Sequence, residues 1–143
     1  MKVGFTGTRE ETTTDQFHAL CEWMQRQTGA AEFHHGCCVG ADSDAWEAAV
    51  EHLKGVKVVA HPPTNKSLVS ESAIEFADEV RDAKPYLFRN ADIVNETGML
   101  LACPKGPEEL RSGTWSTVRF ARKLGRRIII IYPDGSIVEE PPK

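Results

Sequence analysis

Four short polar segments of this sequence contain the residue types that bind phosphate. They read "TGTRE" at 6–10, "HGCCVGADSD" at 35–44, "HPPTNKS" at 61–67 and "PKGPEELRSGTW" at 104–115. Three of the four combine glycine, small hydroxyls and a polar helix start. Such loops let backbone N–H groups approach an anion at the positive end of a helix dipole. Arg9 and Arg111 add guanidinium forks that suit phosphate oxygens, so the pattern predicts a phosphate site.

Carboxylates in the same segments add a second kind of chemistry. Asp42, Glu108 and Glu109 lie within or beside the glycine-containing stretches. Cleavage of an N-glycosidic bond needs a carboxylate that stabilises an oxocarbenium-like centre or activates water. These three residues are therefore the candidate catalytic residues. For Asp42, capping of a helix is an equally good explanation.

The run "HHGCC" at 34–38 also contains metal-ligating residue types. Neighbouring side chains on a strand point to opposite faces, so His34 and His35 cannot both face one ion. The sequence also lacks a Cys-x-x-Cys pair of the kind found in zinc sites. We therefore predict no metal site and no required cofactor.

The elements that position these segments follow from the alternation of two hydrophobic periods. Apolar runs typical of strands stand at 2–7, 31–36, 56–63, 98–104 and 127–133. Helical stripes lie between them at 17–24, 46–53, 73–80 and 115–124, with a short helix expected at 86–94. Parallel strands need such crossover connections. The expected fold is α/β, a Rossmann-like three-layer αβα sandwich with a mainly parallel five-stranded sheet.

Residues at the ends of these helices agree with this assignment. Thr13 and Gln16 have the spacing of a capping box, and Asp42 and Ser112 are types that cap helices. Capping alone is one explanation of the stretch Ser112–Thr114. The other follows from the expected sheet, because ligands of open α/β sheets bind beyond the carboxyl ends of the strands. All four polar segments fall at that edge.

Composition limits the classes of function. The chain has 143 residues with 41% hydrophobic content and a formal net charge of −4. We expect one domain at 1–138 followed by a frayed tail at 139–143. The acidic balance disfavours non-specific nucleic-acid binding, and no apolar segment is long enough for a signal peptide or a membrane span. Four irregularly spaced cysteines favour free thiols, so we expect a cytoplasmic protein without a membrane partner.

Two well-known nucleotide fingerprints are absent. The sequence has no G-x-x-x-x-G-K-[ST] segment, and "GFTGTR" does not match G-x-G-x-x-G. Other motifs support a nucleotide instead. "FRNADIV" at 88–94, "MLLACP" at 99–104 and "RSGTWSTVRFARKLGRRIIII" at 111–131 resemble, in order and spacing, the core of the DprA/Smf family. "GTR" and "HGCCVGADSDA" resemble the glycine-rich loops of the wider SLOG group of Rossmann-like domains, which includes the LOG phosphoribohydrolases.

This resemblance implies a nucleotide- or phosphate-binding site and a homodimer or larger homo-oligomer, because the resembled families commonly pair. The implied residues, with Arg111 added from its position, are Gly7, Thr8, Arg9, Gly36, Gly40, Asp42, Arg89, Asn90, Arg111, Ser112, Gly113, Thr114 and Thr117. Phosphate is expected between the 7–9 loop and Ser112–Thr114. The base and ribose are expected to face Asp42 and the Pro62–Pro63 loop.

Departures from the resembled families leave three hypotheses. LOG enzymes carry an acidic pair after Gly-Thr, whereas this chain has Trp115, Ser116 and Thr117 there. That difference favours a nucleotide-binding sensor or carrier without chemistry. The alternatives are a nucleotide N-glycosidase that uses Glu108, Glu109 or Asp42, and a DprA-like single-stranded DNA binder. The DNA reading relies on basic residues such as Arg119 and Arg122, which we otherwise expect to be solvated near a helix end.

Overall fold

The computed structural model describes residues 1–143 and contains one mixed sheet of seven strands in the order β4-β3-β2-β1-β5-β6-β7. The strands are β1 (Lys2–Gly7), β2 (Glu32–His35), β3 (Lys57–Ala60), β4 (Glu79–Val80), β5 (Met99–Cys103), β6 (Arg127–Ile131) and β7 (Ile137–Glu140). All neighbours pair in parallel except β6 and β7, which are antiparallel. The predicted α/β class and mainly parallel sheet are confirmed, with seven strands in place of five.

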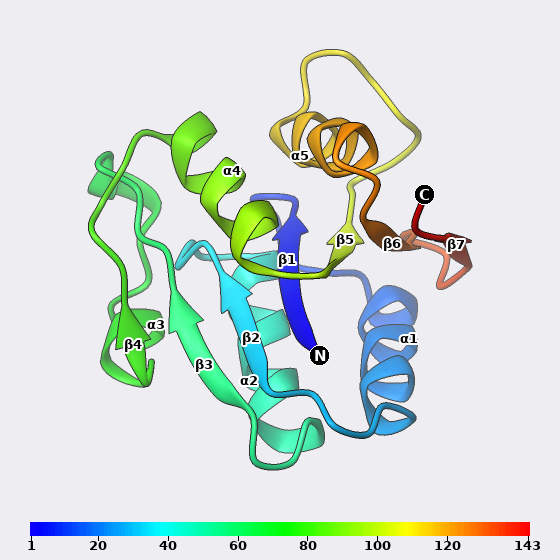
Figure 1. Cartoon of the computed structure of the whole chain (residues 1–143), viewed down its shortest axis with the longest axis horizontal. Helices are drawn as coiled ribbons and strands as arrows, with labels where there is room; N and C mark the ends of the chain where they lie inside the picture. Colours follow the sequence, from blue (N-terminus) through cyan, green and yellow to red (C-terminus); the bar gives the residue numbers. More distant parts are fainter.

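Helices cover both faces of the sheet. They are α1 (Thr14–Gln25), α2 (Ala41–His52), α3 (Glu71–Glu75), α4 (Tyr86–Glu96) and α5 (Gly113–Lys123), with a 3-10 turn at Lys66–Leu68. Figure 1 shows α2 behind the strands and α4 crossing in front of them. None of these helices combines the length and the apolar character needed to span a bilayer.

Successive side chains of the central strands enter two separate cores. Leu101 and Ile129 belong to the larger core beneath α1 and α2, whereas Leu100 and Ile128 pack in the smaller core beneath α5. Strand side chains alternate between faces, so a strand covered on both sides must be apolar throughout. The four consecutive isoleucines of β6 meet this requirement.

Helix starts agree with the sequence in two cases and differ in one. Thr13 and Gln16 form the predicted capping box of α1, and the Ser112 hydroxyl accepts the N–H of Trp115 at 3.2 Å. The predicted cap Asp42 is not the cap of α2, because Gly40 occupies that position. Asp42 lies inside the first turn, where its carboxylate instead accepts the N–H of Cys38.

Two predicted element assignments are wrong. The helical stripe expected at 73–80 ends at Glu75, and Glu79 and Val80 form β4 beside β3. Glu139 and Glu140, expected in a frayed tail, belong to β7. Both added strands are short and charged, and each is ordered by its pairing with a longer neighbour, which local sequence does not reveal.

Candidate functional site

A cavity of about 500 Å³ opens at the carboxyl end of β1, between its neighbours β2 and β5. The chain leaves β1 for β2 on one side and returns to β5 on the other, so the strand order reverses here. Such switch points are where open α/β sheets bind ligands. Twelve predicted residues line the cavity: Gly7, Thr8, Arg9, Gly36, Asp42, Arg89, Asn90, Glu109, Arg111, Ser112, Gly113 and Thr114.

One side of the cavity, here called the packed wall, consists of Gly7, Gly36, Asp42 and Arg89. Arg89 is only 7% exposed, and its guanidinium is committed to protein acceptors. It donates to the carbonyl of Gly36, to the carbonyl of His61 at 3.2 Å, and to the Asn90 amide oxygen at 2.7 Å. Arg89 therefore ties the start of α4 to the ends of β2 and β3.

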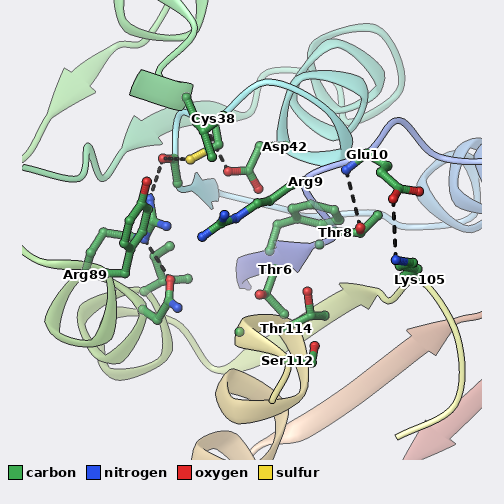
Figure 2. A pocket seen from close by; sticks show the side chains of 18 of the residues that line it. Thr6, Thr8, Arg9, Glu10, Cys38, Asp42, Arg89, Lys105, Ser112 and Thr114 are labelled. Atoms are coloured by element: carbon green, nitrogen blue, oxygen red, sulfur yellow. Dashed lines mark hydrogen bonds and ion pairs between the residues drawn. The ribbon is translucent and has the colours of Figure 1, made fainter. Parts of the chain in front are cut away.

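Asp42 is the buried anion of the packed wall. Its Oδ2 accepts the N–H of Cys38 at 3.1 Å, and its side chain faces the cavity (Figure 2). Burial raises the pKa of this carboxyl to about 6, while the Arg89 charge and backbone N–H groups oppose the rise. The Asp42 carboxylate thus already interacts with the positive end of the α2 dipole, which disfavours phosphate binding at that helix start.

Glycines of the packed wall are fixed by close packing. A Cβ at Gly7 would lie 2.6 Å from the Ala41 Cβ, and one at Gly36 would lie 2.5 Å from the Arg89 guanidinium. Gly40, just behind the wall, has φ +90° and would place a Cβ 2.2 Å from the Arg9 carbonyl oxygen. Gly40 does not line the cavity, so its role is to let the chain pass close to the Arg9 backbone.

The opposite side, here called the open wall, consists of Glu109, Arg111, Ser112, Gly113 and Thr114. The N–H groups of Gly113 and Thr114 lie in the first turn of α5 and make no hydrogen bond within the protein. A Cβ at Gly113 would have no neighbour within 4 Å. Arg111 is exposed and forms no ion pair. The open wall therefore presents unpaired donors to the cavity.

Arg9 lies between the two walls. Figure 2 shows its side chain crossing the cavity between Asp42 and the start of α5 at Ser112 and Thr114. The guanidinium carbon of Arg9 is 5.8 Å from the ring centre of Tyr86, and that of Arg89 is 5.3 Å from the same ring. Arg9 forms no hydrogen bond or ion pair of its own, so it is a second uncommitted cation in the cavity.

Some predicted residues lie elsewhere. Glu108 does not line the cavity but pairs with Arg122 at 2.9 Å and with Arg119 at 3.2 Å. These two arginines lower the pKa of the Glu108 carboxyl. Thr117 is buried and donates to the Gly113 carbonyl, and the loop Pro62–Pro63 does not line the cavity. These residues are close in sequence to cavity residues but do not line the cavity.

The basic residues behind the DNA hypothesis are also partly committed. Arg122 binds Glu140 at 2.8 Å in addition to Glu108, and Arg119 donates to two carbonyls of the loop before α5. These contacts neutralise the two arginines within the protein. They agree with the expectation that the end of α5 is a solvated face.

Eight further residues line the cavity without having been predicted as site residues: Phe5, Thr6, Glu10, Cys38, Leu68, Tyr86, Ile93 and Lys105. Tyr86 directly follows Pro85 at the start of α4 and stands three residues before Arg89, a signal that the predicted helix at 86–94 already contained. The exposed Lys105 approaches Glu10 at 3.6 Å, so it offers only a screened charge.

Neighbouring histidines of β2 face opposite sides of the sheet, as the alternation predicts. His35 packs near Phe33 and Trp46, on the side of the larger core. His34 contacts Glu32 and His61 on the other side. All four cysteines are free thiols, and burial raises the pKa of the Cys37 thiol to about 12.

Comparisons with known proteins establish the fold. No protein family and no curated protein matches the sequence. Among solved structures, the chain is similar to the molybdenum cofactor binding protein of the phototrophic bacterium Rippkaea orientalis, with a TM-score of 0.68 and 20% identity. That similarity covers 92% of this chain and 76% of the other.

DNA processing protein A (DprA) also has a similar fold. The Helicobacter pylori protein, described by its single-stranded DNA binding mode, matches with a TM-score of 0.64 and 20% identity over 91% of this chain. The Streptococcus pneumoniae protein matches with a TM-score of 0.67 and 19% identity over 90%. This chain spans 64% and 49% of their lengths. The Rossmann-like fold is thus confirmed and resembles that of DprA proteins.

Proposed function

We propose that this protein binds a small organic phosphate, namely a nucleotide or a nucleotide-derived cofactor, in the cavity at the end of β1. The observation that carries the proposal is the open wall. Two first-turn N–H groups of α5 and the guanidinium groups of Arg9 and Arg111 have no partners in the protein. Unpaired backbone donors at a helix start, together with free cations, are the usual elements of a phosphate site.

The two walls determine the orientation in which the ligand binds. Phosphate binds at Gly113 and Thr114, because the Asp42 carboxylate repels a second anion at the packed wall. The Asp42 carboxylate accepts hydrogen bonds from the polar end of the ligand, such as a sugar hydroxyl or a ring N–H. The ring of Tyr86, which lines the cavity, offers an apolar surface for a flat heterocycle.

The shape of the site supports a small molecule over a polymer. The cavity volume of about 500 Å³ suits a compact ligand. A protein of similar fold binds the molybdenum cofactor. The expected homo-oligomer stays a prediction.

A thermal-shift screen tests the proposal. Nucleoside mono-, di- and triphosphates, cyclic nucleotides, NAD and ADP-ribose are each added to the full chain. A ligand at a hundredfold its Kd adds about 2.7 kcal/mol of stability, which raises the Tm by several degrees. The shift should disappear in Arg9→Gln and Arg111→Gln. It should persist in Arg26→Gln, which removes the exposed arginine that follows α1.

Two results would count against the proposal. One is a shift that both cavity variants retain in full. The other is the absence of any shift across the screen, combined with binding of an oligothymidylate whose affinity falls steeply with salt. The second result would support the single-stranded DNA hypothesis instead.

Asp42 favours a second candidate function, cleavage of a nucleotide N-glycosidic bond. A buried carboxyl with a pKa of about 6 is suited to proton transfer near neutral pH. Glu109 also lines the cavity, whereas Glu108 is held outside it by Arg119 and Arg122. Incubation with nucleoside monophosphates should then release free base, and Asp42→Asn should abolish the release. No release from any nucleotide that binds would leave the binding function alone.

A further inference from the structure

Four side chains on the α4 side of the sheet form a continuous row that lies outside the phosphate cavity. Glu32 Oε1 lies 2.8 Å from His34 Nε2, and His34 Nδ1 lies 2.7 Å from His61 Nε2. The row ends where His61 Nδ1 faces Glu96 Oε2 at 3.9 Å. Both histidines are buried, at 0% and 2% exposure. The row joins β2, the residue after β3 and the end of α4, and Figure 1 shows α4 crossing in front of the strands.

Hydrogen bonding along this row leaves one nitrogen with neither a proton nor a hydrogen-bond partner. Glu32 is an acceptor, so His34 donates from Nε2 and carries a lone pair on Nδ1. His61 must then donate from Nε2 to His34, which leaves a lone pair on its Nδ1. That lone pair faces the carboxylate of Glu96, which is also an acceptor. The two atoms are too far apart for a hydrogen bond and are of the types that bind metal ions.

The surroundings hold both atoms ready for a cation. Arg81 binds Glu96 Oε1 at 2.9 Å, which turns Oε2 toward His61. The Glu32–His34 pair fixes the tautomer of His61, as carboxylate–histidine pairs do around metal ligands.

We propose that His61 Nδ1 and Glu96 Oε2, with His34 beside them, form a binding site for a divalent transition-metal ion such as Zn²⁺. Two metal–ligand bonds of about 2 Å each, bent at the metal, span the distance between these two atoms. Both ring nitrogens of His34 are engaged by Glu32 and His61, so His34 positions His61 and does not itself bind the ion. Glu96 is 33% exposed at its side chain, so the ion enters from the solvent side and water completes its coordination.

Calorimetric titration of the metal-stripped full chain with zinc chloride tests this site without any nucleotide. One Zn²⁺ should bind per chain, and His61→Ala and Glu96→Gln should each weaken binding by at least about tenfold. His34→Gln should also weaken it, because the tautomer of His61 is then no longer fixed. His18→Ala removes an exposed histidine of α1 and should leave the affinity unchanged.

Folding of each variant is checked by circular dichroism, and nitrogen NMR of the wild-type imidazoles provides a test that needs no variant. His61 should show an unprotonated Nδ1 near neutral pH, with a resonance that shifts on addition of zinc. The proposal is overturned if His61 Nδ1 carries a proton, if zinc leaves its resonance unmoved, or if His61→Ala and Glu96→Gln bind zinc as the wild type does. Because no nucleotide is involved, failure here leaves the phosphate site untouched.

Discussion

The packed wall and the open wall of the cavity contain similar residue types but differ in what those residues contact. Arg89 and Asp42 of the packed wall are buried and hydrogen-bonded to the backbone of the β2–α2 loop. Arg111 of the open wall forms no ion pair, and the N–H of Gly113 has no partner in the protein. The polar groups of the packed wall therefore stabilise the fold, whereas those of the open wall are free to bind a ligand. Mutations of the same type should consequently act on stability at one wall and on binding at the other.

The largest effect is expected for Gly40→Ala behind the packed wall. The new Cβ would overlap the Arg9 carbonyl oxygen, and φ at this position is +90°. Since neither backbone segment can move freely, the free energy of unfolding should fall by more than about 3 kcal/mol in urea denaturation. Gly55→Ala is the matched control, because Gly55 has φ +74° but open space around it. Equal losses in the two variants would show that backbone conformation alone matters.

A somewhat smaller loss is expected for Arg89→Met. The carbonyls of Gly36 and His61 lose a donor, and the buried Asp42 loses the favourable charge of Arg89. Unfolding free energy should drop by about 3 kcal/mol. Arg111→Met should change it by less than about 0.5 kcal/mol. A loss at Arg111 as large as that at Arg89 would contradict the division into two walls.

Asp42→Asn should increase stability at alkaline pH. The pKa of Asp42 in the folded protein, about 6, lies above the ordinary value of 3.8, so folding favours the protonated form. Its stabilising contribution is present below about pH 4 and is lost as the pH rises through 6. Asparagine keeps an acceptor for the Cys38 N–H without the charge. We expect a gain on the order of 2 kcal/mol at pH 8 and little change at pH 4, measured by urea denaturation.

The smallest effect on stability is expected for Gly113→Leu in the open wall. Nothing within 4 Å opposes the new side chain, so the Tm should change by no more than about two degrees. The side chain would nevertheless cover the free N–H groups at the start of α5. Any nucleotide-induced thermal shift of the wild type should therefore be lost. A retained shift would place the phosphate elsewhere.

Sequence periodicity predicted most of the fold because local and tertiary preferences agree there. The four-isoleucine strand, the capping box at Thr13 and the cap at Ser112 are each determined by a few neighbouring residues. β4 and β7 escaped prediction because their order depends on pairing with β3 and β6.

The cavity lining was predictable where residues follow strands directly, as Thr8 and Gly36 do. The contacts of Arg89 were not predictable, because they join residues that are 53 and 28 positions apart in the chain. Glu108 was predicted as a cavity residue because it is close to Ser112 in sequence. Its ion pair with Arg122, which holds it outside the cavity, could not be predicted from that proximity. Long-range pairing of charges decides which polar residues reach a cavity.

The antiparallel strand β7 has a consequence for solubility. The segment 127–132, with its four isoleucines, combines high β propensity with apolar side chains, the composition of segments that stack into fibrils. β7 caps its free edge, and Glu139 and Glu140 are held there by Arg127 and Arg122 at 2.7 and 2.8 Å. The outermost strand is thus charged and four residues long, a poor template for another chain. Glu139 and Glu140 thus help to shield an aggregation-prone segment from other chains.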